Sequence, residues 1–180
     1  LRIMGAEITG RSGDNFAPLS IKGNLLNGIE YEMQVASAQV KSAILIAGLF
    51  AKSETLINQP DLSRDHTERM IKYIRQCNSK SDIYFKVPGD ISSAGFLIVL
   101  CIITYNSSII IKDVLYNKTR NGLIDILKQM GSNIKIKNIR SNSGEYVCDI
   151  YAQYTSDLNA VDLDCKIYNN MIDEIPIFCA

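Results

Sequence analysis

Two long stretches of the chain present apolar and polar positions in the same order. Residues 42–74 read as an apolar helix, a polar turn, a short β-branched strand and an amphipathic helix, and residues 94–131 repeat these parts in the same order. Similar segments at a fixed separation, here about 55 residues, are the signature of a repeated supersecondary unit. Because helices and strands alternate in that unit, the pattern predicts an α/β protein.

Glycines end helices at matching points of this repeat. Leu123, Ile124, Leu127 and Met130 recur at helical spacing, and Gly131 follows them as a helix stop. Residues 3–8 repeat the pattern of residues 130–134, with Gly5 in the place of Gly131. This predicts a second helix stop, at Gly5, and a third, partial unit at the start of the chain. Extended stretches with β-branched or alternating residues predict strands at 19–21, 55–57, 109–111, 134–137, 146–151 and 161–163.

Three apolar helices are predicted to begin with polar residues. These beginnings lie at 35–39, with Ser37 and Gln39, at 88–93, with Asp90 and Ser92, and at 171–176, with Asp173. Backbone N–H groups at a helix start lack partners, so a polar side chain there is either an N-cap or part of an anion site. Both interpretations stay open from the residues alone, which reach no further than an anion-binding α/β repeat protein.

Composition excludes several classes of function. The 19 basic and 19 acidic residues balance, so there is no basic footprint for nucleic acid, and no apolar run is long enough to span a membrane. Five cysteines without a C-x-x-C pair favour a reducing compartment, and their apolar neighbours predict small buried side chains. A single histidine, His66, leaves little for a histidine metal site or a catalytic triad.

Five strings carry a family resemblance: VASAQVKSAILIAGL, SRDHTERM, VPGDISSAGF, NKTRNGLIDILKQMG and MIDEIPI. In this order they closely resemble the 3-phosphoshikimate 1-carboxyvinyltransferases, also called 5-enolpyruvylshikimate-3-phosphate synthases. The resemblance implies two domains built from βαβαββ units, an inside-out α/β barrel present here only in part. It places the later part of the first domain at 1–87 and the earlier part of the second at 88–180, with the crossover near 87–90.

The resemblance also implies a reaction. The family transfers the enolpyruvyl group of phosphoenolpyruvate to the 5-hydroxyl of shikimate 3-phosphate and releases phosphate, without a cofactor or metal. This is a step of aromatic amino-acid (chorismate) biosynthesis. We therefore expect a cytoplasmic enzyme with two small anionic substrates, no nucleic-acid or membrane partner, and a monomeric full-length form.

Particular residues match the family's motifs. By resemblance, Ser37 and Ala38 hold the phosphate of shikimate 3-phosphate, Gln39 lies between the two substrates, and Arg64 adds a charge-assisted contact to the same phosphate. Asp173 binds the shikimate hydroxyls and takes part in proton transfer at the 5-hydroxyl. Lys41 belongs to the same motif, with packing and a surface charge as its two open roles, and His66 is expected to be structural.

Other parts of the family's site fall outside this sequence. These are its early Lys-Ser phosphate site, its glycine-rich phosphoenolpyruvate loop, and its later Lys-Glu and Arg clusters. Both ends of the chain look cut, so we expect these residues to belong to a longer enzyme and to have no transferase activity alone. Two alternatives stay open: UDP-N-acetylglucosamine enolpyruvyl transferase, which residues 63–68 fit poorly, and a non-catalytic remnant that keeps part of the shikimate 3-phosphate site.

Overall fold

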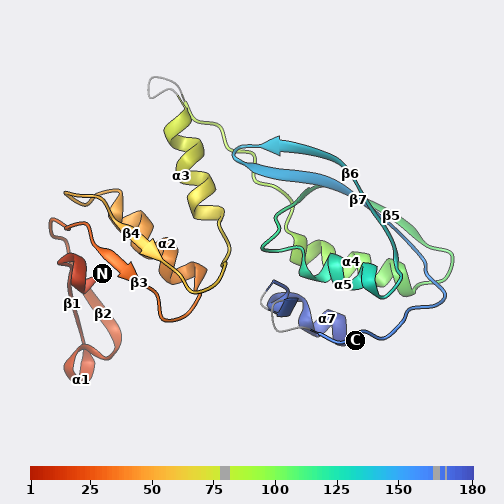
Figure 1. Cartoon of the computed structure of the whole chain (residues 1–180), viewed down its shortest axis with the longest axis horizontal. Coiled ribbons are helices and arrows are strands. Elements are labelled where there is room, and N and C mark those ends of the chain that lie inside the picture. The colour runs from red at the N-terminus through yellow and green to blue at the C-terminus, as the bar shows by residue number, and fades with distance from the viewer. Residues whose placement is uncertain (78–81, 164–166, 169) are drawn as a thin grey trace. The chain divides into compact units, whose positions relative to one another are not determined.

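The chain forms two compact units, Leu1–Glu68 and Arg69–Ala180, in a computed structural model (Figure 1). The structure describes residues 1–77, 82–163, 167–168 and 170–180. Each unit is treated by itself below. The division falls inside helix α3 (His66–Gln76), whose first residues belong to the first unit.

The second unit is a sheet with helices on one face (Figure 1). Strands β5, β7 and β6 form an antiparallel sheet in that order, with the two strands of the β6–β7 hairpin adjacent. Helices α4 and α5 pack on this sheet, and a 3₁₀ turn, η2, leads into the short helix α7. The elements, in chain order, are α4 (Ile91–Ile103), β5 (Ser108–Leu115), α5 (Gly122–Gln129), β6 (Asn133–Asn142), β7 (Glu145–Gln153), η2 (Ile172–Glu174) and α7 (Ile175–Cys179).

One apolar core holds this unit together. Ile98 and Ile102 of α4, Leu123 of α5, and Cys148 and Ile150 of β7 are all within 1% of full burial and belong to the same cluster. Burying a side chain of this size contributes roughly 1.5–3 kcal/mol. The core therefore fixes the starts of α4 and α5, which is where polar residues gather.

The second unit contains a whole copy of the predicted repeat. Gly89 forms a parallel bridge to Val114 of β5, with hydrogen bonds of 2.8 Å from the Gly89 N–H to Asp113 and from the Leu115 N–H back to Gly89. This bridge stands where the first strand of a βαβαββ unit would be, so the order of elements along the chain is the bridge at Gly89, then α4, β5, α5, β6 and β7. The βαβαββ unit is thus confirmed within residues 89–153.

The first unit repeats parts of the same design. Its elements are η1 (Arg2–Met4), β1 (Glu7–Gly10), the kinked turn α1 (Arg11–Asp14), β2 (Phe16–Lys22), β3 (Glu30–Glu32), α2 (Ala38–Gly48), β4 (Leu56–Asn58) and the start of α3. Parallel pairing of β3 with β4 around α2 corresponds to the bridge of Gly89 with β5 around α4. Strands β1 and β2 form an antiparallel pair, as β6 and β7 do.

The two predicted glycine stops are confirmed. Gly5 follows η1 at φ 99°, and Gly131 follows α5 at φ 92°. A left-handed backbone is strained for any residue with a Cβ atom, so glycine is the residue that ends both helices and directs the chain into the next strand. The third, partial unit predicted at the start of the chain is present.

The first unit buries far less apolar surface than the second. Within residues 1–68, all of which the structure describes, the buried apolar side chains are Met4, Met33 and Ile44. Helix α2 is mostly apolar in sequence, yet of its apolar residues only Ile44 is buried, while Phe50 just beyond it is 78% exposed. The apolar face of α2 lacks enough facing side chains inside this unit to cover it.

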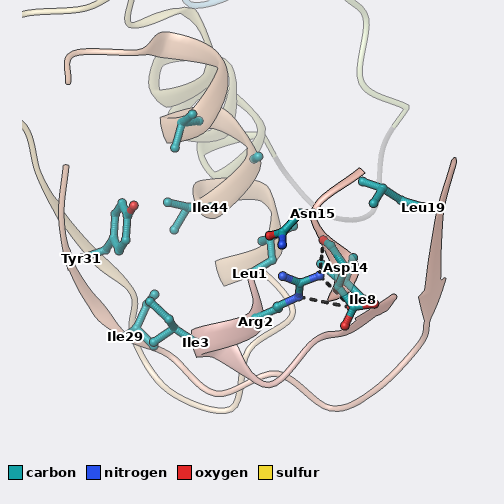
Figure 2. Close-up of a pocket in the computed structure, with 12 residues that line it drawn as sticks. Leu1, Arg2, Ile3, Ile8, Asp14, Asn15, Leu19, Ile29, Tyr31 and Ile44 are labelled. Atoms are coloured by element: carbon teal, nitrogen blue, oxygen red, sulfur yellow. Dashed lines mark hydrogen bonds between the residues drawn. The ribbon is translucent and has the colours of Figure 1, made fainter. Parts of the chain in front are cut away.

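A hollow of about 520 Å³ lies against this face (Figure 2). Ile8, Ile29, Tyr31 and Ile44 are among the residues that line it. Arg2 also lines it, but its guanidinium already donates to the carbonyls of Ile8 at 2.9 Å and Asp14 at 3.1 Å. Since the lining is mostly apolar and its cation is engaged, the hollow is a packing surface and not an anion site.

Some strand predictions were wrong. Residues 161–163 form no strand, because Val161 packs on the core from an irregular segment without a ladder partner. Strand β3 was missed, since two of its three residues are glutamates and show no apolar alternation. By resemblance, the run 72–86 is shorter than in the family, which predicts that a strand hairpin of the repeat is trimmed or missing. Residues 82–88 form no strand, in agreement with this prediction, while 78–81 lie outside the described residues. The domain crossover near 87–90 stays a prediction.

The burial expected for cysteines holds at some positions. Cys101 and Cys148 are buried, as predicted, whereas Cys77 is half-buried and Cys179 is exposed. Cys179 follows Phe178, the last side chain of α7 that packs against the core, which explains its exposure. Cys165 lies outside the described residues. Among the described helices, none has the length and hydropathy needed to cross a bilayer.

A carboxylate on the central strand joins two bulges of the sheet. The register shifts near Asp113 in β5 and Asn138 in β6, both at positive φ. Between them, Asp149 of β7 accepts hydrogen bonds from the Asn138 amide at 2.9 Å, the Arg140 guanidinium at 3.0 Å and the Asp113 N–H at 3.2 Å. The bonds from Asn138 and Arg140 lower the pKa of Asp149 to about 2.

This carboxylate predicts a pH-dependent stability. Because the folded-state pKa of Asp149 lies below its ordinary value of 3.8, its contribution is present above pH 4 and is lost as pH falls toward 2. Asp149→Asn should therefore lower the melting temperature at pH 6 by several degrees and converge with the parent chain near pH 2. Thermal unfolding followed by circular dichroism checks this. Asp157→Asn, at an exposed carboxylate, is the control; equal losses in both variants would contradict the assignment.

Cysteine exposure predicts an order of thiol reactivity. Burial raises the pKa of Cys148 to about 11, so its thiolate is scarce at pH 8, and Cys101 is shielded in the same core. Of the four cysteines that the structure describes, Cys179 should react first with N-ethylmaleimide, followed by Cys77, while Cys101 and Cys148 react only after unfolding. Peptide mass spectrometry after timed labelling measures the order. Labelling of Cys148 as fast as that of Cys179 in the folded chain would contradict the described core.

Candidate functional site

Helix α2 begins with a serine that leaves a donor available. Ser37 is the N-cap, with φ −120° and ψ 112°, and its Oγ accepts a hydrogen bond from the Val40 N–H at 3.3 Å. A serine hydroxyl both accepts and donates, and capping uses only its acceptor side. The N-cap and anion-contact interpretations of Ser37 are therefore compatible, because its O–H can still donate to a bound oxygen.

The next residues add further donors to this helix start. Ala38 and Gln39 occupy the first turn, where backbone N–H groups have no intrahelical acceptor, and Gln39 is exposed. The dipole of an 11-residue helix adds about half a positive charge at that end. Hydroxyl, amide and backbone donors together make the start of α2 suitable for a phosphate or a carboxylate.

Two side-chain contacts hold the segment around Arg64 against α2. The Lys41 ammonium pairs with the Glu68 carboxylate at 2.6 Å, and the hydroxyls of Ser42 and Thr67 are 2.6 Å apart. Arg64 is half-buried and lies just before α3, to which both Glu68 and Thr67 belong. These contacts bring residues 63–68 to the first turns of α2 within the first unit.

The position of Lys41 decides between its two predicted roles. Its side chain is 4% exposed, so it is packed and paired and is not a surface charge. The sequence could not show this, because the partner Glu68 comes from the next helix. His66 is the first residue of α3 and is half-buried.

A shallow hollow of about 160 Å³ adjoins Ser37. Tyr31, Met33, Val35 and Val40 contribute to its lining. The larger apolar hollow described above includes neither Ser37 nor Gln39 nor Arg64. Ser37 thus lines the smaller hollow, which shares Tyr31 and Val40 with the larger one.

The start of α4 is closed by its own side chains. Asp90 is the N-cap and accepts hydrogen bonds from the Ser93 N–H at 2.9 Å and the Ser93 hydroxyl at 2.8 Å. Burial raises the pKa of Asp90, but these bonds and nearby Arg120 outweigh it, so the net pKa is lowered. The Ser92 hydroxyl donates to Glu174. Capping, and not anion binding, accounts for this helix start.

Asp173 lies in η2, beside a guanidinium. Its carboxylate is about half exposed, and its Oδ2 lies 3.7 Å from Nη1 of Arg120. The neighbouring Glu174 is 1% exposed and lies 3.6 Å from Nη2 of the same arginine. An exposed carboxylate held beside a buried ion pair is a hydrogen-bond acceptor at a fixed position, which suits hydroxyl groups and not a phosphate.

The structure thus places the predicted residues in two groups. Ser37, Ala38 and Gln39, with the segment of Arg64, belong to the first unit, and Asp173 belongs to the second. Arg120 was missed, although it lies inside the quoted motif NKTRNG. Glu174 stood out beside Asp173 as a polar residue among apolar neighbours, but its burial could not be predicted. The available signal was an arginine next to the first turn of an amphipathic helix. In the part of the chain that the structure describes, no group of His, Cys, Asp and Glu could hold a metal ion.

The Lys41–Glu68 pair predicts an asymmetry between its two partners. Lys41→Met leaves a carboxylate that is 37% exposed and can be rehydrated, so we expect a loss of about 1 kcal/mol of unfolding free energy. Glu68→Gln leaves the buried ammonium without its counter-charge, so we expect about 3 kcal/mol. Urea unfolding of both variants measures the difference. The reverse order would contradict the described burial of Lys41.

Comparison with known proteins places this geometry in a family. The family model "EPSP synthase (3-phosphoshikimate 1-carboxyvinyltransferase)" matches residues 1–180. Proteins named 3-phosphoshikimate 1-carboxyvinyltransferase from Thermodesulfovibrio yellowstonii and Geobacillus kaustophilus are 45% and 46% identical to the chain, over 99% and 98% of it. These alignments cover 45% and 44% of the two relatives, so the chain spans less than half of their length.

A solved structure shows the same likeness in three dimensions. EPSP synthase from Acinetobacter baumannii superposes with a TM-score of 0.85 at 37% identity, over 99% of this chain and 44% of that one. The partial α/β fold built from repeated units is thereby confirmed. The chain belongs to the EPSP synthase (3-phosphoshikimate 1-carboxyvinyltransferase) family.

Proposed function

We propose that the protein to which these residues belong transfers the enolpyruvyl group of phosphoenolpyruvate to the 5-hydroxyl of shikimate 3-phosphate. The observation that carries the proposal is the start of α2, where a serine cap keeps its O–H available within a motif that matches the family. The relatives carry the name of this activity over alignments that cover nearly all of the chain.

The first unit would bind the phosphate of shikimate 3-phosphate. The Ser37 hydroxyl and the backbone N–H groups of Ala38 and Gln39 supply donors, and Arg64 supplies a positive charge. Charge-assisted hydrogen bonds of this kind are about twice as strong as neutral ones. The Gln39 side chain, exposed in the first turn, would reach between the two substrates.

The second unit would supply the carboxylate. Asp173 is exposed, so it can accept hydrogen bonds from the shikimate hydroxyls and take part in moving the proton of the 5-hydroxyl during attack. The oxygen of the 5-hydroxyl loses its proton and forms a new C–O bond to the enolpyruvyl group. The C–O bond between that group and the phosphate breaks, and the released phosphate takes up the proton overall. No cofactor takes part in this proposal.

The proposal concerns the whole protein. The chain spans less than half the length of its relatives, and the family's phosphoenolpyruvate motifs have no counterpart among its residues. We propose that the 180 residues alone release no phosphate, that the two domains meet near residues 87–90, and that the full-length enzyme acts as a cytoplasmic monomer.

Substitutions of Ser37 test the phosphate contact apart from the cap. Aspartate is as good an N-cap as serine, so Ser37→Asp should keep the helix stable while its charge repels phosphate. We expect at least a hundredfold rise of KM for shikimate 3-phosphate in the protein that the whole gene encodes. Ser37→Ala should raise KM about tenfold, for one lost hydrogen bond to a charged group. Phosphate release measures both.

Ser93→Ala is the matched control, since that hydroxyl also lies in a first helical turn but donates to Asp90. Its KM should stay within about twofold of the parent, because no substrate contact is lost. If Ser37→Asp behaves like the parent, Ser37 is a cap only. If shikimate 3-phosphate stabilises the full protein but no phosphate is released with phosphoenolpyruvate present, the non-catalytic remnant replaces the transferase.

A further inference from the structure

Arg120 lies in a loop that the fold holds rigidly. Asn117 is 2% exposed and organises the turn: its side-chain oxygen accepts from the Thr119 N–H at 2.9 Å, and its carbonyl accepts from the Arg120 N–H at 2.9 Å. The next residues begin α5, whose Leu123 is fully buried. The backbone of Arg120 is therefore fixed at both ends, by a turn and by a core helix.

One guanidinium faces three carboxylates from two other elements. Nη2 of Arg120 lies 3.4 Å from Asp90 at the start of α4, and Nη1 lies 3.7 Å from Asp173 in η2. Nη2 also lies 3.6 Å from Glu174 and donates to the Ser92 hydroxyl, which in turn donates to Glu174. The Arg120 side chain is 11% exposed, so solvent screens these interactions little.

Two glycines allow these elements to approach. A Cβ atom at Gly122 would lie 2.9 Å from the Met171 side chain, and one at Gly95 would lie 2.7 Å from Leu123. Both glycines thus permit contacts that a larger residue would block. The approach at Gly122 brings the segment that carries Asp173 against the start of α5, within reach of Arg120.

The two acidic residues of η2 that face Arg120 differ in burial and in their contacts. Glu174 is buried, and its Oε1 receives the Ser92 hydroxyl, so it anchors η2 to α4. Asp173 is about half exposed, and its Oδ2 faces Nη1 of Arg120. A planar guanidinium can contact several oxygens at fixed angles, which an ammonium cannot. Arg120 therefore places a fixed positive charge 3.7 Å from the Asp173 carboxylate.

We infer that Arg120 is a positioning residue for Asp173: by bridging the starts of α4 and α5 to η2, it holds the Asp173 carboxylate in the orientation that meets the shikimate hydroxyls. The inference rests on the proposed function, because it gives Asp173 the substrate contact stated there. Arg120 itself acts through Asp173 and touches no substrate.

A double-mutant cycle in the protein that the whole gene encodes tests this. Arg120→Gln should weaken binding of shikimate 3-phosphate, measured by calorimetry, about tenfold and lower kcat about a hundredfold, as expected when a reacting group is displaced by roughly 1 Å. KM for phosphoenolpyruvate should stay within about twofold. In an Asp173→Asn background, Arg120→Gln should change the affinity by less than about twofold, because the residue it positions is already altered.

Two further variants separate positioning from general stability. Arg120→Lys keeps the positive charge but not the planar guanidinium with its several donors. Its affinity for shikimate 3-phosphate and its kcat should therefore fall between those of the parent and those of Arg120→Gln. Arg140→Gln is the matched control: that guanidinium also joins carboxylates of the second unit, Asp113 and Asp149, but has no contact with η2 among those described. It should lower the melting temperature and leave kcat and both KM values of the folded protein unchanged.

The outcomes are distinct. Equal losses of affinity from Arg120→Gln with and without Asp173→Asn would overturn the inference, since Arg120 would then act without Asp173. Unchanged binding and kcat in Arg120→Gln and Arg120→Lys, both folded by circular dichroism, would overturn it as well. If the parent protein neither binds shikimate 3-phosphate nor releases phosphate, the proposed function fails first and takes the inference with it.

Discussion

The first backbone N–H groups of a helix have no intrahelical acceptor and need hydrogen bonds to other oxygen atoms. The two units supply these acceptors differently. In α4 the oxygen belongs to Asp90, whose carboxylate binds the first turn and Arg120 at once. In α2 it is the hydroxyl of Ser37, which accepts from one N–H and keeps a proton to donate. An aspartate cap closes a helix start to anions, while a serine cap leaves it open to them. The proposed division of labour, with phosphate at α2 and hydroxyl groups at Asp173, follows from this difference.

The energetic basis of the two units also differs. In the second unit, an apolar core around Ile98, Leu123 and Ile150 positions the helices whose starts carry Asp90 and Arg120. The first unit has few buried apolar residues, and specific polar contacts, such as Lys41 with Glu68, hold α2 to the start of α3. The exposed apolar face of α2 and the hollow beside it agree with a chain that covers less than half of its relatives (Figure 2).

Much of the local structure could be predicted from the sequence, because it depends on neighbouring residues. The spacing of Leu123, Ile124 and Leu127 predicted α5, and Gly5 and Gly131 marked two helix ends. Strand β3 was not predicted, because glutamates are typical of loops. Residues 161–163 were predicted as a strand, but Val161 packs on the core without a ladder partner. Burial of Lys41 and the contacts of Arg120 depend on partners remote in sequence, so spacing could not reveal them.

The motifs pointed to the candidate site residues more readily than to the roles of their neighbours. Ser37 and Asp173 stood out as polar residues next to apolar helices, whereas Glu174, in the same motif as Asp173, proved to be a buried anchor. The most direct test is a crystal structure of the full protein with shikimate 3-phosphate. The account predicts Ser37 Oγ within about 3 Å of a phosphate oxygen and Asp173 against a ring hydroxyl. A phosphate bound elsewhere, with the Ser37 hydroxyl making no contact to it, would contradict the account.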